Sequence, residues 1–103
     1  MGFKVNMEQL VQQFTPDAAK SQVTTAMTGT KVFKKGSGAD VNILGWVCIR
    51  VVPSALSSYY FNSDTTKTFP LAASVNNDIC VLSNDITQVS LVLGAATASI
   101  QGM

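Results

Sequence analysis

The chain has 103 residues, a net charge of +1 and no histidine, and these totals exclude several classes of protein. Hydrophobic residues make up 47% of it and charged residues 13%, whereas disordered chains are rich in charge and poor in apolar residues. A broad nucleic-acid footprint needs clustered Lys and Arg, and the commonest general base, His, is missing. We expect one small domain whose neutral polar surface tolerates a neighbouring subunit, because few ions would lose their water.

The first 30 residues are predicted to form a short helical arm. Apolar residues spaced as on one face of a helix are Met7, Leu10, Val11 and Phe14. A second helix is predicted from Thr15-Pro16-Asp17, which suits a helix start, to Gly29, which suits a helix end. Two such short helices are marginal alone, so they are expected to dock on the β-domain, on a sister subunit or on a larger partner.

Residues 31–38, KVFKKGSG, combine three lysines with a flexible joint. This segment either contacts an acidic partner or forms a short exposed strand whose lysines protect its edge, and the second interpretation is favoured. We therefore divide the chain into a helical arm with its joint, residues 1–35, and a β-domain, residues 36–103.

The run Val41–Val52, VNILGWVCIRVV, is predicted to be a central strand. One face is aliphatic and should meet the core; it consists of Val41, Ile43, Val47, Ile49 and Val51. The opposite face is also mostly apolar and needs a cover from the arm or a neighbouring subunit. On that face lie Trp46, Cys48 and the only arginine, Arg50, which either makes an intersubunit contact or extends to solvent at the strand end.

Further strands are predicted over residues 55–61, 68–72, 79–82 and 86–93, and the tail forms either a last strand through Ile100 or an arm. Pro70 cannot donate to a strand ladder, so its strand is expected at a sheet edge. Turn signals recur about every 8–12 residues, a spacing typical of an antiparallel β-sandwich or small barrel. The predicted fold is therefore mainly β, an antiparallel β-sandwich or small barrel with a short helical N-terminal arm.

Residues that carry chemistry are sparse, so neither catalytic nor metal-binding nor cofactor-binding residues are predicted, and an enzyme is not expected. Most of the acids sit singly beside turn residues, where they commonly bond their own backbone. The segments at 76–78 and 83–85 could bring oxygens together around a calcium ion, but turn caps explain them better. Cys48 and Cys80 can pair if their strands are neighbours, although buried free thiols are the favoured interpretation. No signal peptide is expected at the N-terminus, and no apolar run approaches the roughly 20 residues of a membrane span.

The helical arm MEQLVQQF…PDAAKSQV, the GSG joint and the compact Ser/Thr/Val/Ala-rich β-domain together resemble small virion structural proteins of tailed bacteriophages. These are capsid decoration (cement) proteins, or short tail and fibre-base subunits. The resemblance implies assembly in a host cytoplasm, location in the virion, homo-oligomers that are often trimers, and binding to major capsid or tail proteins. The near-neutral charge and the lack of a long apolar run separately predict no direct contact with nucleic acid or membrane. No functional residue is carried over from the resemblance.

The leading hypothesis is a non-enzymatic structural protein that oligomerises and docks on a capsid or tail lattice to stabilise it. The residues predicted to form the partner interface are Met7, Leu10, Val11, Phe14, Val23, Met27, Phe33, Trp46 and Arg50. The alternative is a receptor- or glycan-binding module that uses Tyr59, Tyr60 and Phe69, because aromatic faces suit sugar rings. A small regulator that works by protein contact is a third possibility.

Overall fold

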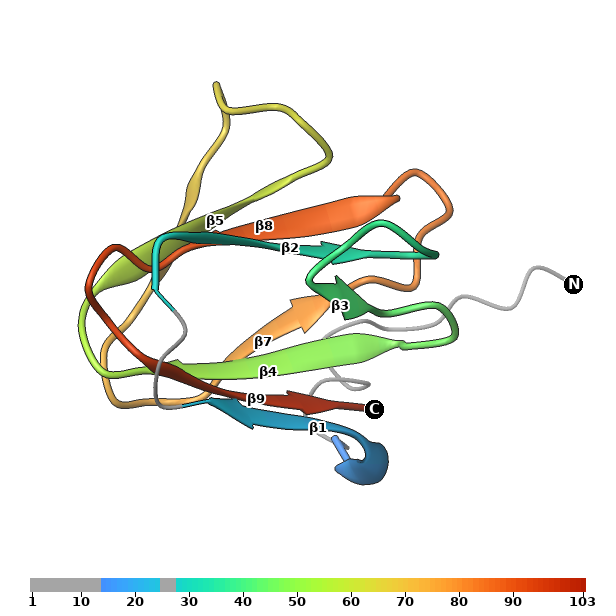
Figure 1. Ribbon diagram of the computed structural model, residues 1–103, viewed down its shortest axis with the longest axis horizontal. Helices are drawn as coiled ribbons and strands as arrows, with labels where there is room; N and C mark the ends of the chain where they lie inside the picture. Colours follow the sequence, from blue (N-terminus) through green and yellow to red (C-terminus); the bar gives the residue numbers. More distant parts are fainter. Residues whose placement is uncertain (1–13, 25–27) are drawn as a thin grey trace, which may run out of the picture.

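The computed structural model describes residues 14–24 and 28–103, except for the side chains of residues 22–24, and this part of the chain is all β. Two sheets face each other in a sandwich-like arrangement (Figure 1). The strands are β1 (Asp17–Thr24), β2 (Thr30–Lys34), β3 (Val41–Asn42), β4 (Cys48–Pro53), β5 (Ser57–Phe61), β6 (Phe69–Leu71), β7 (Asn77–Cys80), β8 (Gln88–Val92) and β9 (Ala98–Gly102).

The four-stranded sheet has the order β1-β9-β4-β7, and the five-stranded sheet has the order β3-β2-β8-β5-β6. Neighbouring strands are antiparallel apart from β2 and β3, which pair in parallel with Phe33 opposite Val41. From β4 onward the chain changes sheet at each connection except the β5–β6 hairpin. The prediction of a mainly antiparallel β-fold is confirmed, and β6, which contains Pro70, lies at an edge as expected.

One hydrophobic core fills the space between the sheets. Both sheets contribute fully buried side chains, including Phe33, Ile49, Val51, Leu71, Val81, Val89, Leu91 and Ile100. Alternation along each strand produces this core, because successive side chains point to opposite faces of a sheet. In β4 the predicted inward face is confirmed, since Ile49 and Val51 are both 0% exposed.

The predicted helix over residues 15–28 is wrong where the structure describes it, because Asp17–Thr24 form strand β1. Gln22 and Thr24 lie opposite Ile100 and Ala98 of β9. Backbone pairing with the edge of β9 therefore outweighs the local preference for a helix that begins at Thr15-Pro16-Asp17. Asp17 still accepts a hydrogen bond from the Ala19 backbone N–H at 3.0 Å, but as a turn within an irregular stretch of strand. Strands β1 and β2 thus come from the segment that we predicted to be an arm.

The predicted continuous strand Val41–Val52 is interrupted by a turn. Gly45 has φ +85°, a left-handed conformation that favours glycine, and it separates β3 from β4. The side-chain oxygen of Asn42 accepts hydrogen bonds from the N–H groups of Gly36 and Leu44, at 3.1 and 2.9 Å, and fixes the turn. After the turn, the ring of Trp46 folds back into the core and packs against the backbone of Gly102 in β9.

Candidate functional site

In the described part of the chain, three loops that contain no charged side chain meet at one end of the sandwich. We call residues 54–56, 72–76 and 94–97 the neutral loop end; their sequences are SAL, AASVN and GAAT. Figure 1 shows these connections, which follow β4, β6 and β8, gathered at the left-hand end of the long axis. Three separate parts of the chain therefore form one uncharged surface.

Backbone hydrogen bonds join these loops into one unit. The Ser54 N–H donates to the Thr97 carbonyl at 2.7 Å, and the Thr97 N–H donates to the Ser54 hydroxyl at 2.9 Å. The Ser74 N–H donates to the Pro53 carbonyl at 2.8 Å, which ties the second loop to the first. Loops that are held by such hydrogen bonds are already ordered, so they lose little conformational entropy when a partner covers them.

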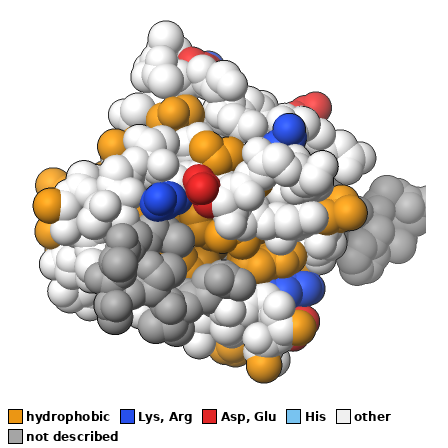
Figure 2. All heavy atoms as spheres, viewed as in Figure 1, with side chains coloured by type: hydrophobic (Ala, Val, Ile, Leu, Met, Phe, Trp, Pro, Cys, Tyr) orange, Lys and Arg blue, Asp and Glu red, His pale blue; other side chains and the backbone are white. Residues whose placement is uncertain are grey.

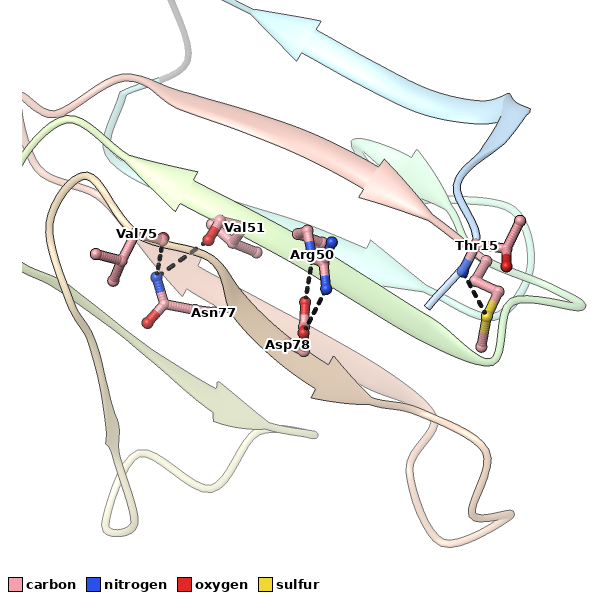
Figure 3. A network of polar contacts seen from close by, with 7 residues as sticks. Thr15, Arg50, Val51, Val75, Asn77 and Asp78 are labelled. Atoms are coloured by element: carbon pink, nitrogen blue, oxygen red, sulfur yellow. Dashed lines mark hydrogen bonds and ion pairs between the residues drawn. The ribbon is translucent and has the colours of Figure 1, made fainter. Parts of the chain in front are cut away.

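Asn77, the first residue of β7, fixes the loop at 72–76 from inside. Its side-chain N–H group donates to the carbonyls of Val51, Ala72 and Val75, each at 3.0 Å, and its oxygen accepts from the Ala72 N–H at 2.9 Å. Figure 3 shows the amide directed at Val51 on β4 and at Val75 in the loop. One side chain thus holds Val75 in its exposed position.

Two large hydrophobic side chains project from the neutral loop end. Leu56 is 74% exposed and Val75 is 51% exposed. In Figure 2 the left-hand extremity shows hydrophobic and uncharged atoms, with neither blue nor red side chains among them. The opposite end also exposes two leucines, Leu44 and Leu82, but Lys35 extends across the loop there and donates to the Ser83 carbonyl at 3.0 Å.

A second feature is an aromatic hollow beside the β5–β6 hairpin. Tyr59 stacks on Phe69 with ring centroids 5.2 Å apart, and Phe61 lies 5.7 Å from Phe69. A cavity of about 80 Å³ is lined by Phe61, Phe69, Asp64 and Lys67. The hydroxyl and backbone N–H of Thr66 both donate to the Asp64 carboxylate and lower its pKa, so this side chain is an anion at neutral pH.

The hollow offers an apolar wall with one anion and one cation beside it, which suits a small polar ligand with an apolar face. Of the predicted glycan-binding residues, Tyr59 and Phe69 stack on each other, while Tyr60 points to the other face of β5. Burial raises the pKa of Tyr59, and Phe69 remains 40% exposed. The structure therefore brings two of the three residues together, and adds Phe61, Asp64 and Lys67.

A third feature is an ion pair on the outer face of the four-stranded sheet (Figure 3). Arg50 donates from Nε and from its terminal Nη2 to the two carboxylate oxygens of Asp78, at 2.6 and 2.8 Å. This bidentate contact raises the pKa of Arg50 further above its ordinary value. The Phe14 ring lies 4.3 Å from the guanidinium carbon of Arg50, a cation–π contact that covers part of this face.

The residues that we predicted as a partner interface are dispersed. Phe14 and Arg50 contact each other, whereas Phe33 and Trp46 belong to the core. Val23 lies in β1, but its side chain is outside the described part. The remaining predicted residues, Met7, Leu10, Val11 and Met27, also lie outside the described residues. Leu56 and Val75 were missed, although the lack of charge in their loops was visible in the sequence.

Comparisons with known proteins found no match to a family model, a curated protein or a solved structure. Within residues 14–24 and 28–103, no group of three or more His, Cys, Asp or Glu side chains is placed to hold a metal ion. The described part of the chain also has no helix long and apolar enough to cross a membrane.

Proposed function

We propose that the protein is a non-enzymatic structural protein that binds a second copy of itself through the neutral loop end and docks on a larger lattice. The observation that carries this proposal is the pairing of exposed Leu56 and Val75 with loops that hold no charge. Burying these side chains removes apolar surface from water without desolvating an ion, so the hydrophobic gain is not offset by a charge penalty.

The size of this end sets the expected strength of the contact. The molecule measures 47 × 25 × 25 Å, and the neutral loop end occupies one of the two small ends. A stable interface buries about 800 Å² on each partner, which is more than a 25 × 25 Å end provides. One such contact is therefore weak, and repetition over a lattice multiplies it by avidity.

A virion lattice, of a capsid or a tail, is the setting that the resemblance implies for such a protein. A small subunit with a neutral surface can be added many times to such a lattice without accumulating charge repulsion. We propose that the lattice consists of major capsid or tail proteins, and that the protein stabilises it by bridging neighbours. Detection of many copies of this chain in each purified virion, by quantitative mass spectrometry, tests this placement.

Self-association is tested by sedimentation velocity over a range of protein concentrations. The natural chain is expected to show a concentration-dependent rise in mass. The double variant L56S/V75S is expected to remain a monomer, whereas the matched control L44S/L82S, with the exposed leucines of the opposite end replaced, should associate as before. A natural chain that stays monomeric at millimolar concentration, or equal loss of association in both variants, would overturn the proposal.

Glycan binding is a second candidate function, and the aromatic hollow is the observation that favours it. Phe61 and Phe69 supply an apolar wall, and Asp64 and Lys67 can bond sugar hydroxyls beside it. Titration of the labelled protein with methyl glycosides, followed by nuclear magnetic resonance, should shift signals of these residues. The shifts should disappear in Phe69→Ala and persist in Tyr60→Ala, which alters the other face of β5. Absence of shifts with every glycoside excludes this function.

A further inference from the structure

The two cysteines lie directly opposite each other on neighbouring strands. Cys48 is the first residue of β4, Cys80 is the last residue of β7, and they are register partners in this antiparallel pair. Both side chains are in the reduced thiol form, with no disulfide between them. The sequence left their pairing open, and the sheet order now places them side by side.

The backbone hydrogen bonds show which kind of antiparallel pair this is. On the β9 side, the Cys48 N–H donates a hydrogen bond to the Met103 carbonyl at 3.4 Å, and the Cys48 carbonyl accepts one from the Met103 N–H at 3.1 Å. On the β7 side, the Val81 N–H donates to the carbonyl of the preceding residue, Val47, at 2.8 Å. Cys48 and Cys80 therefore form a non-hydrogen-bonded pair, in which Cα atoms lie about 4.5 Å apart and side chains are closest. This spacing falls within the roughly 4.4–6.8 Å range of disulfides.

We propose that Cys48 and Cys80 form a redox site that closes to an intramolecular disulfide by exchange with a small disulfide such as glutathione disulfide. The Cys80 thiolate attacks one sulfur of the oxidant, forms a mixed disulfide and releases one glutathione thiolate. The Cys48 thiolate then attacks the Cys80 sulfur, forms the Cys48–Cys80 bond and releases the second glutathione. The protein loses two protons and two electrons, and the oxidant is reduced to two thiols.

The surroundings of the two thiols determine this order of attack. Cys80 is half-buried and Cys48 is 0% exposed, so the oxidant meets Cys80 first. Burial, together with the neighbouring Cys80 and Asp78, raises the pKa of Cys48 to about 12, and Arg50 opposes that rise. A thiol with such a pKa is rarely ionised at neutral pH, so the second exchange is slow and the mixed disulfide accumulates before the ring closes.

The Cys48–Cys80 disulfide would link β7, at the edge of the four-stranded sheet, to the inner strand β4. Among the strands of residues 14–24 and 28–103, β7 pairs with β4 alone, so within this part of the chain that ladder is its lateral support. A disulfide across it constrains the unfolded chain between residues 48 and 80 and is expected to stabilise the fold. The oxidised form is therefore expected to resist heat better than the reduced form. This inference is independent of the proposed self-association.

The test uses the full reduced chain incubated with glutathione disulfide, quenched with acid, and analysed by intact and peptide mass spectrometry. The natural chain should pass through a single glutathione adduct to a monomer that has lost two hydrogens and yields a Cys48–Cys80 linked peptide. Cys48→Ala should stop at the adduct, and Cys80→Ala should react far more slowly. The oxidised monomer should unfold at a temperature at least about 5 °C higher.

Three outcomes would overturn the proposal. They are a natural chain that stops at the glutathione adduct, one that forms intermolecular dimers while folded, and one whose linked form unfolds at a lower temperature than the reduced form. Circular dichroism of both alanine variants confirms that they are folded. If either variant fails to fold, blocking the natural chain with N-ethylmaleimide at Cys80 replaces it, and the blocked protein should gain no glutathione.

Discussion

Replacing Gly102 with alanine should destabilise the fold by overpacking the core beside the tryptophan. An added Cβ would lie 2.6 and 2.7 Å from two ring carbons of Trp46, and 2.6 Å from the Cβ of Lys20. Carbon atoms in contact ordinarily lie about 3.5–4.0 Å apart, so the ring or the strand must move by about 1 Å. Overpacking of this kind costs about 1–3 kcal/mol, and we expect a loss of about 2 kcal/mol in the free energy of unfolding.

Urea unfolding of Gly102→Ala, with Ser99→Ala as a control on the exposed face of the same strand, measures this loss. The control should change the free energy of unfolding by less than about 0.5 kcal/mol. In a Trp46→Leu background the added methyl group still meets the Cβ of Lys20 but no longer meets the ring, so Gly102→Ala should cost less there than in the natural chain. A Gly102→Ala variant as stable as the natural chain would refute the steric argument, and an equal cost in both backgrounds would refute the part of it that rests on the Trp46 ring.

Three further predictions concern the outer face of the four-stranded sheet and the loop beside it. Asp78→Ala leaves Arg50, whose side chain is 23% exposed, without its carboxylate, and should cost about 1–3 kcal/mol in urea unfolding; a loss below about 0.5 kcal/mol contradicts this. At pH 8 iodoacetamide should modify Cys80 and spare Cys48, whose pKa is about 12, in the folded protein, whereas both react in guanidinium; equal labelling in the folded state argues against the burial. Asn77→Ala removes four hydrogen bonds and should cost about 2 kcal/mol, with earlier proteolysis of the loop at 72–76.

Much of the sheet could be predicted from the sequence because alternation and turn residues are local signals. The hairpin of β5 and β6, the edge position of Pro70 and the inward face of β8 follow from the pattern of single strands. The opposite directions of Tyr59 and Tyr60 follow in the same way. These features need no knowledge of the strand that lies alongside.

Features set by a distant partner could not be predicted in this way. Asp17–Thr24 carry a plausible helix start, yet they form a strand because β9, more than 70 residues later, presents an edge to pair with. The turn at Gly45 is another case. A glycine inside an apolar run is compatible with a β-bulge and with a turn, so the sequence alone does not decide between them. The structure forms a turn there, and Trp46 just after it packs on Gly102, which lies far away in the sequence.

The neutral loop end depends even more strongly on contacts between residues that are far apart in the sequence. Each of its three loops is an ordinary uncharged connection when read alone, and only the alternation of the chain between the two sheets brings them to one end. Asn77 shows how the fold and this surface are linked, because the residue that starts β7 also fixes the loop that exposes Val75. The same short strand ends at Cys80. A disulfide at Cys80 would therefore secure the strand that supports the neutral loop end, at the end of the strand farthest from the loop. Oxidation should accordingly leave self-association intact while it raises thermal stability, and sedimentation of the oxidised chain checks that separation.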